Sequence, residues 1–510
     1  MATRAVADIM SSPVVTAEAT ELLSDAATHM HEHKVGSVVV VDGGKPVGIL
    51  TESDLVRLAA EGADANAKVG EWMTADPYTI TSAVEVADAW NTLSERGYRH
   101  IPVVDDGELV GMVSMRDLVG IAQIAPMAHP SLVDAPKGLE GVVVAETTVG
   151  DVRGQEGFYH YRHYNAVELA GKRSLEDVWY LLFSGELPDA TERKAFLDEV
   201  RPMAAIPDAV KPLLPDIAKA GEHPGPLDAL RTAMSAVAQS LDLRPSMDTD
   251  AVTRRTDALR LCAVTPTLIM ALHRLRNGLD PLEPSDDLGY SANYLYLLTG
   301  EVPDPDHARA VEQYQISTID HGFNASTFTA RVVTSTGADF GSAVVAALGS
   351  LSGPLHGGAP SRALDMLDAI GTPDKTEAWI RNAVEHGERI MGFGHRVYKT
   401  DDPRSLMLRD VAQRLGGDKA AFATQVEKTV VDVLAELKPG RHLYANVEFY
   451  AGVVMDRCGL PRELFTPTFA SSRVIGWCAN MLEQAADNRI VRPSARYVGP
   501  PPPQPVPDPE

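Results

Sequence analysis

An internal repeat opens the chain and limits how this region can fold. Three blocks of sequence recur after 63 residues: VADIM and VGEWM (6–10 and 69–73), GSVVVVD and RHIPVVD (36–42 and 99–105), and GILTESDLV and GMVSMRDLV (48–56 and 111–119). Two copies are too few for a solenoid, which needs at least about three stacked units. We therefore expect the copies to form two halves of one compact domain.

Each copy predicts the order helix, strand, strand, helix. Residues 38–41 are four consecutive valines, and a second short apolar run follows a pair of glycines that favours a turn. Thr51 precedes Asp54 by three positions, which is the spacing of a capping box at the start of a helix. Ser114 and Asp117 repeat this spacing in the second copy.

The repeat resembles a tandem CBS domain, whose paired halves commonly bind adenosine-containing ligands in the cleft between them. The resemblance implies that Thr51 with Asp54, and Ser114 with Asp117, hold a ribose, because each carboxylate can accept hydrogen bonds from ribose hydroxyls. The alternative is that both pairs only cap helices. The sequence leaves both interpretations open. We expect an adenine nucleotide as an effector, and these two pairs are its candidate binding residues.

The charge of the chain argues against partners with a negative surface. The 510 residues carry a formal net charge of −24, and residues 1–125 hold 19 acidic and 8 basic side chains. Nucleic acids and anionic membranes are bound through an excess of Lys and Arg. We therefore expect no nucleic acid and no membrane as a partner, and a nucleotide would need a specific groove.

The cysteines indicate a reducing, cytoplasmic environment. The chain has 3 cysteines, Cys262, Cys458 and Cys478, at wide spacings that fit neither a disulfide scaffold nor a zinc site. No apolar stretch is expected to span a membrane, and the N-terminus lacks the pattern of a signal peptide. Three alternating histidines (His29, His31 and His33) lie near a predicted helix end, where the dipole favours cations, so no metal site is expected.

Proline-rich stretches mark the expected domain boundaries. Residues 124–137 contain three prolines, which interrupt helical continuity, and residues 499–510 contain seven prolines, which favour an extended tail. The chain is therefore expected to be multidomain. Its predicted parts are a tandem CBS domain (1–123, with repeats at about 1–60 and 64–123), a linker (124–137), a larger second domain (138–498) and a proline-rich tail (499–510).

The larger second domain is predicted to be mainly α-helical. Ser174 has the spacing of a helix N-cap and Gly185 that of a helix end, while Asp304 followed by proline predicts a further helix start. Apolar residues at helical spacing predict a helix over residues 426–437. Few strands are expected, and the best candidate is the apolar run at residues 142–145.

Four glycine-rich or polar segments interrupt these helices and are expected to carry the chemistry. They are DHGFNASTFTAR (320–331), GPLHGGA (353–359), GFGHRVYKTDDPR (392–404) and NVEFYAG (446–452). His356 and His395 both lie beside glycines, which allow a backbone to approach a ligand closely. One such histidine alone would favour a structural role, whereas two favour a functional site.

Taken in order, these segments resemble the citrate synthase family, from Gly138 to about Gly499. Further matching segments are GLEGV (138–142), WYLLFSGELP (179–188), LRTAMSA (230–236), SSRVIGW (471–477) and RPSARYVGP (492–500). The family condenses an acyl-CoA with a 2-oxo acid. The resemblance implies that His356 stabilises the enolate of the thioester and that His395 polarises the ketone of oxaloacetate.

The resemblance also implies which residues bind the dicarboxylate. Arg404, Arg473 and Arg492 match the family's substrate arginines, since guanidinium groups pair well with carboxylates. Arg492 would come from the neighbouring subunit of a homodimer. His321 and Phe469 match further contacts at the substrate pocket.

For CoA, the resemblance implies backbone contacts at Gly392 and Gly394 and a phosphate contact at Lys399. A solvated lysine is the alternative for Lys399. CoA enters as the thioester substrate, and no separate cofactor is expected.

Glu448 stands where the family usually has its general-base aspartate. A carboxylate is kept, but its oxygens are displaced by roughly one bond length, and a misplacement of about 1 Å can cost about 100-fold in rate. Three hypotheses therefore remain: a regulated synthase using acetyl-CoA, a 2-methylcitrate synthase using propionyl-CoA, and a non-catalytic metabolite sensor.

Overall fold

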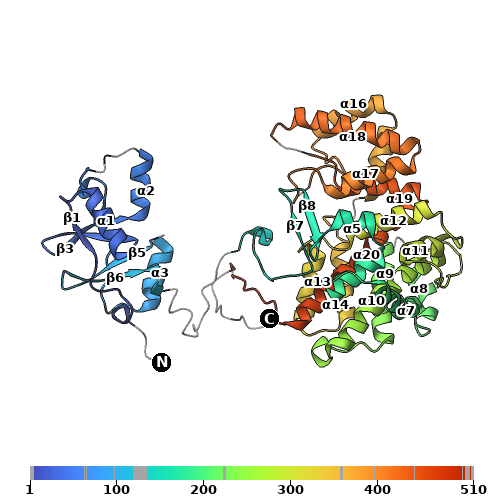
Figure 1. Cartoon of the computed structure of the whole chain (residues 1–510), viewed down its shortest axis with the longest axis horizontal. Coiled ribbons are helices and arrows are strands. Elements are labelled where there is room, and N and C mark those ends of the chain that lie inside the picture. The colour runs from blue at the N-terminus through green and yellow to red at the C-terminus, as the bar shows by residue number, and fades with distance from the viewer. Residues whose placement is uncertain are drawn as a thin grey trace. The chain divides into compact units, whose positions relative to one another are not determined.

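The computed structural model describes residues 5–61, 64, 66–96, 98–115, 117–118, 135–221, 225–356, 360–395, 397–440, 443–496, 498–499 and 506. The chain forms two compact units, Met1–Gly138 and Leu139–Glu510, which we call the front unit and the helical unit (Figure 1). Most of the predicted linker and of the proline-rich tail lies outside the described residues.

The front unit has the predicted order of elements. The first copy contains β1 (Thr16–Glu18), α1 (Leu23–His33), β2 (Ser37–Asp42), β3 (Lys45–Thr51) and α2 (Glu52–Glu61). The second copy contains β4 (Thr74–Ala75), α3 (Val86–Arg96), β5 (His100–Asp105) and β6 (Glu108–Ser114). One sheet has the order β1-β2-β3-β4, and β5 pairs with β6. Residues 115, 117 and 118, which follow Ser114, are helical as predicted.

The two halves of the front unit are interlocked. Val6, from the first copy, is buried in a cluster with Ile101 and other residues of the second copy. Val69, from the second copy, is buried in a cluster with Leu23 and other residues of the first. Each copy therefore lends its first segment to the core of the other, and neither core is complete alone.

Close packing explains why glycines recur in the repeat. A Cβ on Gly48 would lie 2.2 Å from the Met73 sulfur, and a Cβ on Gly111 would lie 2.3 Å from the Met10 sulfur. These two pairs are equivalent under the repeat. The VADIM and GILTESDLV blocks are therefore matched because each methionine needs the space beside a glycine of the other half.

The helical unit contains one small sheet and many helices. The sheet has the order β7 (Gly150–Arg153), β8 (Phe158–Tyr161), β9 (Tyr164–Asn165). The α-helices are α5 (Ala166–Lys172), α6 (Leu175–Ser184), α7 (Ala190–Val200), α8 (Leu214–Lys219), α9 (Pro226–Ser240), α10 (Ala251–Arg276), α11 (Tyr290–Thr299), α12 (Pro305–Thr318), α13 (Ala325–Ser335), α14 (Phe340–Leu351), α15 (Pro360–Ile370), α16 (Thr376–Glu385), α17 (Pro403–Leu415), α18 (Asp418–Leu437), α19 (Val447–Arg457) and α20 (Phe465–Ala486).

The helix boundaries predicted from the sequence are confirmed, but the strand is not. The Ser174 side chain caps α6 and Gly185 ends it in a left-handed conformation, while Asp304 caps α12. Residues 142–145, predicted as a strand, have no strand partner, and Val143 is 84% exposed. A valine run favours a strand only where a neighbouring strand and a packed face are present. The strands instead begin at Gly150.

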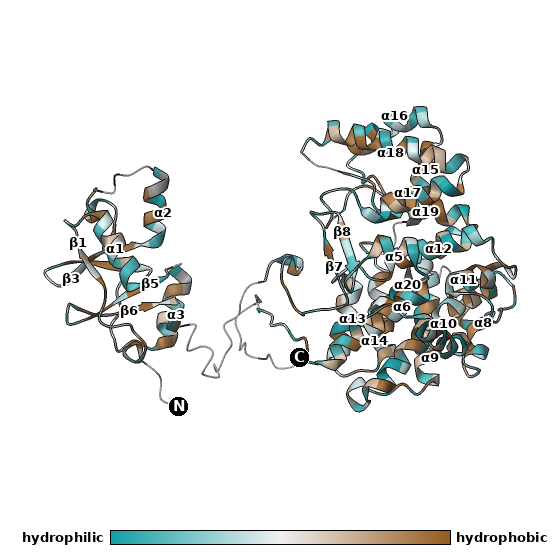
Figure 2. Cartoon of the chain, in the orientation of Figure 1, coloured by the Kyte–Doolittle hydropathy of each residue, from teal (hydrophilic) through white to brown (hydrophobic). Residues whose placement is uncertain are grey.

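The core of the helical unit lies around α10 and α20, which pack against each other. Figure 2 shows hydrophobic and hydrophilic positions mixed along most helices, as expected for helices with one buried face. No stretch was expected to approach a membrane span, but α10 is long and apolar enough to do so by length and composition. Its most apolar window is 78% buried inside the unit, which explains its composition.

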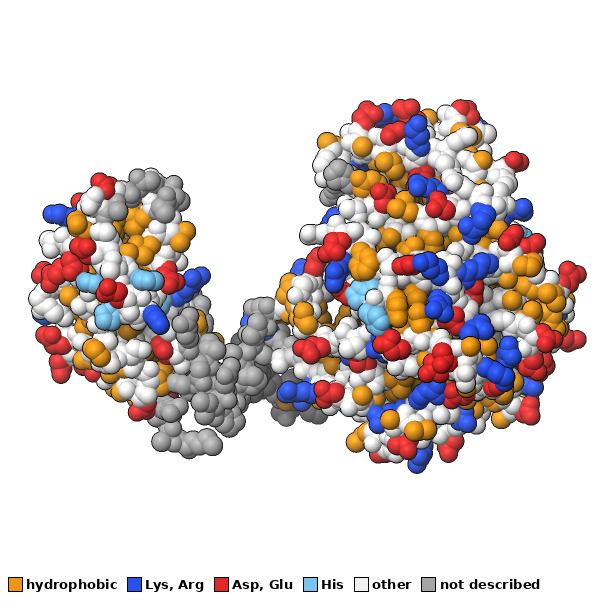
Figure 3. All heavy atoms as spheres, viewed as in Figure 1, with side chains coloured by type: hydrophobic (Ala, Val, Ile, Leu, Met, Phe, Trp, Pro, Cys, Tyr) orange, Lys and Arg blue, Asp and Glu red, His pale blue; other side chains and the backbone are white. Residues whose placement is uncertain are grey.

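The acidic excess is spread over the surface. Figure 3 shows acidic and basic side chains interspersed over the visible face of the helical unit. The negative net charge is therefore not gathered into one acidic patch on that face.

Candidate active site

His395 lies in the loop before α17, and its ring is held in one orientation. Its Nδ1 accepts hydrogen bonds from the backbone N–H groups of Val397 and Tyr398, each at 3.0 Å. Nδ1 is therefore unprotonated, and Nε2 carries the hydrogen of the neutral ring. Burial, together with the charge of Arg404, lowers the pKa of His395 to about 4. Nε2 lies 3.3 Å from Arg404 Nη2. Two donors at this distance can serve one shared acceptor, such as an oxygen of a ligand.

Arg404 forms a buried ion pair with Asp402. Arg404 Nε donates to Asp402 Oδ1 at 3.0 Å, and Nη2 donates to Oδ2 at 2.8 Å. Asp402 also caps α17 and accepts from the Val447 N–H at 3.0 Å, where α19 begins. Burial alone would raise the pKa of Asp402, but Arg404 holds it below its ordinary value. Asp402 thus fixes Arg404 and joins the starts of α17 and α19.

Glu448 lies in the first turn of α19, next to this ion pair. Its N–H donates to the Asn446 side chain at 3.1 Å, and Asn446 donates to the Gly394 carbonyl at 3.0 Å. Burial raises the pKa of Glu448 to about 7, with Arg404 opposing and Asp402 adding to the rise. A carboxyl group with this pKa can accept a proton near neutral pH.

Gly392 and Gly394 have structural reasons to be glycine. Both have positive φ angles, of +80° and +83°. A Cβ on Gly392 would lie 2.9 Å from Phe449 Cβ, and one on Gly394 would lie 3.0 Å from a Leu443 methyl carbon. Their loop pairs with residues 444–446 through two backbone hydrogen bonds of 2.8 Å. Contact with CoA at these glycines stays a prediction.

Lys399 follows this loop and is held through its backbone. Its backbone N–H donates to the Gly154 carbonyl at 3.0 Å, and its side chain is exposed. The positive charge of Lys399 contributes to the low pKa of His395. The phosphate contact of Lys399 therefore stays a prediction.

His356 contacts the start of α13. Its Nε2 accepts from the Ser326 N–H at 3.3 Å and lies 2.8 Å from Ser326 Oγ. Trp477 of α20 donates to the same Oγ at 3.1 Å. Because Nε2 is an acceptor, the hydrogen of the neutral ring is on Nδ1. Burial and Arg473 lower the pKa of His356 to about 4.

Arg473 is buried on α20 and faces the end of α12. Its Nε donates to the Thr318 carbonyl at 2.8 Å, and its guanidinium lies 4.5 Å from the centre of the Phe469 ring. Burial lowers the pKa of Arg473 to about 10, and Asp320 opposes this shift. Among the described residues, no further hydrogen bond engages its two terminal nitrogens. They can therefore bind a carboxylate.

His321 lies near both Arg404 and Arg473, whose charges each lower its pKa. Its Nε2 lies 3.0 Å from the Tyr398 hydroxyl, and its ring centre lies 5.7 Å from that of His395. Burial, then Arg404, lowers the pKa of His321 well below its ordinary value. The structure thus brings together a set of predicted residues: His321, His356, His395, Arg404, Glu448, Phe469 and Arg473.

Sequence reasoning missed several residues that support this set: Tyr159, Asp320, Ser326, Tyr398, Asp402 and Asn446. All but Tyr159 lie inside the segments expected to carry the chemistry, but none of them was singled out. Asp402 carried a further signal, because it precedes a proline as the predicted cap Asp304 does. The other supporting residues contact the site through tertiary packing.

Arg492 is the predicted substrate residue that the chain does not bring to this set. It is exposed, in the segment after α20. The neighbouring Val491 donates its N–H to Ser335 at 3.0 Å. Donation of Arg492 to a neighbouring subunit stays a prediction.

In the front unit, both predicted nucleotide pairs form helix caps. Thr51 donates its N–H and hydroxyl to Asp54 Oδ2 at 2.9 and 2.7 Å. Ser114 makes the same two bonds to Asp117, at 2.8 and 2.6 Å. In Asp54 the second carboxylate oxygen pairs with Arg57 at 3.1 Å. These contacts fit the cap interpretation, and ribose binding stays a prediction.

The cysteines lie away from the surface. Cys262, Cys458 and Cys478 are all buried and free. Within the part of the chain that the structure describes, no three His, Cys, Asp or Glu side chains group as metal ligands would.

The helical unit thus buries neutral histidines beside two arginines and the carboxyl group of Glu448, a set that can hold a carboxylate substrate and accept a proton. The family model described as "Citrate synthase, C-terminal domain" matches residues 138–494, and the one described as "CBS domain" matches residues 6–61 and 69–123. The chain belongs to the citrate synthase family, is an acyltransferase of that family, and carries an N-terminal tandem CBS domain.

Individual relatives cover the helical unit. The chain is 39% identical over 368 residues to a citrate synthase of Deinococcus radiodurans, covering 71% of this chain and 95% of that protein. It is 38% identical over 386 residues to a 2-methylcitrate synthase of Mycobacterium tuberculosis, covering 74% and 95%. A ternary complex of carboxymethyl coenzyme A and oxaloacetate with citrate synthase from Thermoplasma acidophilum has a TM-score of 0.67 and 29% identity, covering 73% and 98%. The predicted family and fold class are confirmed.

Proposed function

We propose that the protein condenses acetyl-CoA with oxaloacetate and hydrolyses the resulting thioester to citrate and CoA. The observation that carries this proposal is the buried set around Arg404 and Arg473. It combines two neutral histidines, each with an assigned N–H, and a carboxyl group whose pKa is about 7. These are the groups that enolate formation from a thioester requires.

In the proposed reaction, Glu448 takes a proton from the methyl group of acetyl-CoA. The Nδ1–H of His356 donates a hydrogen bond to the thioester oxygen, where the enolate charge develops. The low pKa of His356 keeps this ring neutral, so it stabilises the enolate as a hydrogen-bond donor. The methyl carbon then attacks the ketone carbon of oxaloacetate.

The ketone is activated by the other histidine. The Nε2–H of His395 donates a hydrogen bond to the ketone oxygen and stabilises the alkoxide that develops there as the carbon–carbon bond forms. The proton that Glu448 has taken from the methyl group is then available to neutralise this charge. Arg404 and Arg473 bind the two carboxylates of oxaloacetate. The oxaloacetate in the Thermoplasma acidophilum complex supports this choice of 2-oxo acid. Water finally hydrolyses the thioester and releases CoA.

A second candidate is the same reaction on propionyl-CoA, giving 2-methylcitrate. The 38% identity to the Mycobacterium tuberculosis enzyme supports it. The two acyl groups differ by one methylene, which is worth only about 1–3 kcal/mol of discrimination. A thiol-release assay with oxaloacetate and either thioester distinguishes them. We expect faster CoA release from acetyl-CoA, and release from neither thioester would favour a metabolite sensor.

We also propose that the front unit binds an adenine nucleotide and thereby changes the activity of the synthase. The repeated Thr/Ser-x-x-Asp pairs support this proposal. Calorimetry with ATP, ADP, AMP and NADH tests binding, and Asp54→Ala and Asp117→Ala should weaken it. A typical coupling would change substrate affinity about 5- to 150-fold. If no nucleotide binds and removal of the front unit changes no kinetic constant, the regulatory proposal is wrong.

A further inference from the structure

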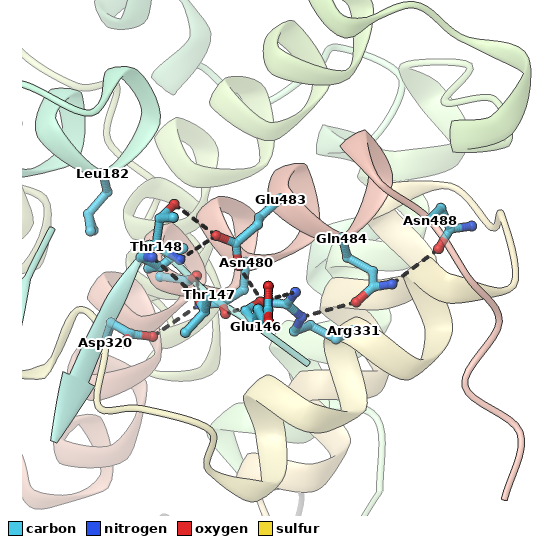
Figure 4. Close-up of polar contacts among 12 residues, drawn as sticks. Glu146, Thr147, Thr148, Leu182, Asp320, Arg331, Asn480, Glu483, Gln484 and Asn488 are labelled. Carbon is cyan, nitrogen blue, oxygen red and sulfur yellow. Dashed lines mark hydrogen bonds and ion pairs between the residues drawn. The ribbon is translucent and has the colours of Figure 1, made fainter. Parts of the chain in front are cut away.

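A line of polar contacts joins the connecting segment (residues 139–149), which follows the front unit along the chain, to α20. Thr148 donates its N–H and hydroxyl to Glu483 Oε1, at 2.6 and 2.9 Å. The other carboxylate oxygen of Glu483 accepts from Arg331 of α13, at 2.7 Å. Figure 4 shows Glu483 between Thr148 and Arg331, so one carboxylate holds both elements.

The line continues into the buried core. Arg331 is 3% exposed and donates to Asn480 at 3.1 Å and to Gln484 at 3.1 Å. Asn480 donates to Asp320 Oδ1 at 3.2 Å, as Figure 4 also shows. Hydrogen bonds therefore link Glu483 to Asp320 through the side chains of Arg331 and Asn480.

Asp320 is where these contacts reach the substrate site. It is 2% exposed and precedes His321, and its second carboxylate oxygen accepts from the Gly322 N–H at 3.2 Å. Among the neighbouring charges, Asp320 most strongly raises the pKa of Arg473 and so stabilises its buried, charged guanidinium. The backbone beside Asp320 packs closely against α20: a Cβ on Gly476 would lie 2.0 Å from the Ile319 carbonyl oxygen, and Arg473 Nε donates to the Thr318 carbonyl at 2.8 Å.

We propose that Glu483 and Arg331 are positioning residues, which hold Asp320 through Asn480 so that Asp320 fixes the guanidinium of Arg473 for the 2-oxo acid. This inference rests on the proposed function, in which Arg473 binds a carboxylate of oxaloacetate. The connecting segment takes part through Thr148. A buried arginine that loses its partner carboxylate is strongly disfavoured, so Arg331 should change its contacts when Glu483 is neutralised.

The test uses the full chain with Glu483→Gln and with Thr148→Val. The second variant replaces the hydroxyl of an exposed residue by a methyl group, so it should fold. It also removes the contact of that hydroxyl with Arg162 Nη1, at 2.6 Å. We expect the KM and the dissociation constant for oxaloacetate to rise about 2- to 30-fold in Glu483→Gln, and less in Thr148→Val. The KM for acetyl-CoA and kcat should change less than twofold. Glu436→Gln, which breaks an exposed pair with Arg381, is the matched control and should change nothing.

The outcomes separate the two proposals. Unchanged oxaloacetate constants in both variants of an active enzyme would overturn the positioning role. Parallel losses in kcat and both KM values, with a lower Tm, would assign Glu483 to stability alone and would also overturn it. A wild-type protein that binds oxaloacetate but releases no CoA would refute the proposed function, while calorimetry on the variants would still test the positioning of Arg473. A wild-type protein that does neither would overturn both.

Discussion

Asp54 in the front unit and Asp402 in the helical unit both bond to the first turn of a helix and pair with a nearby arginine, yet their surroundings differ. The Arg57 side chain beside Asp54 is 53% exposed. The Arg404 and Asp402 side chains are 4% and 1% exposed, and Asp402 also joins the start of a second helix. Capping signals in a sequence therefore show where a helix begins, whereas burial and shared partners show which carboxylate belongs to a reactive site.

The largest expected effect comes from the carboxylate of Glu448. Glu448→Gln should lower kcat by about 10²- to 10⁴-fold, because an amide cannot accept the methyl proton. The measurement is CoA release with the fold checked by circular dichroism. Near-normal turnover in this variant would show that Glu448 is not the base.

Glu448→Asp asks whether the backbone has adapted to the longer side chain. We expect a loss of up to about 100-fold, because the carboxylate would be withdrawn by roughly one bond length. A variant as fast as the wild type, or faster, would instead show that the site keeps the geometry suited to aspartate.

His356→Ala removes the donor proposed for the enolate and should lower kcat by about 10²- to 10³-fold. The thermal midpoint should change little in comparison, because the side chain is only partly buried and bonds to one residue, Ser326. Retained activity would show that another group stabilises the enolate.

Mixed subunits test the prediction for Arg492, which one chain does not bring to its own site. Arg492→Ala and His356→Ala proteins should each be nearly inactive. Hybrids of the two should regain part of the activity, because a symmetric dimer would then contain one intact site. No recovery, with hybrids shown to form by mass spectrometry, would count against a shared site and the homodimer.

The free energy of unfolding measures how differently Asp402 and Asp54 contribute to stability. Asp402→Asn leaves Arg404 buried without its partner charge and should lower the free energy of unfolding by about 3–5 kcal/mol. Asp54→Asn weakens a cap and a pair in which Asp54 is 15% and Arg57 53% exposed, which should cost about 1 kcal/mol or less. Denaturant unfolding of the two variants gives both values. Equal losses would show that burial does not separate these sites.

Sequence patterns were sufficient for much of the fold because their signals are local. The repeat, the valine strands, and the caps at Ser174 and Asp304 depend on neighbouring residues. The predicted strand at residues 142–145 failed because strand formation needs a partner, which the sequence pattern does not supply. The sequence analysis did not recognise α10 as long and apolar enough to span a membrane. Its apolar composition is explained by burial among other helices.

The candidate site was predictable where a residue stands out locally. His356 and His395 stand out because they lie among glycines, and the arginines were found by resemblance. Asp320 and Ser326 lie in a segment that was predicted to be functional, but their roles depend on contacts with residues far away in the sequence, so the pattern did not single them out. The pKa of Glu448 could not be predicted either, since it depends on burial beside Arg404 and Asp402.

The most direct test of the central claim is the pH dependence of kcat/KM for acetyl-CoA at saturating oxaloacetate. The ionised form of Glu448 is the active base, and burial raises its pKa to about 7. We expect kcat/KM to be half its maximum near pH 7, to level off about one pH unit higher, and to fall about tenfold per pH unit well below pH 7, as Glu448 becomes protonated. The histidines, with pKa values of about 4, stay neutral over this range. A rate that stays level from pH 8 down to pH 5 would contradict the assignment of Glu448 as a buried base.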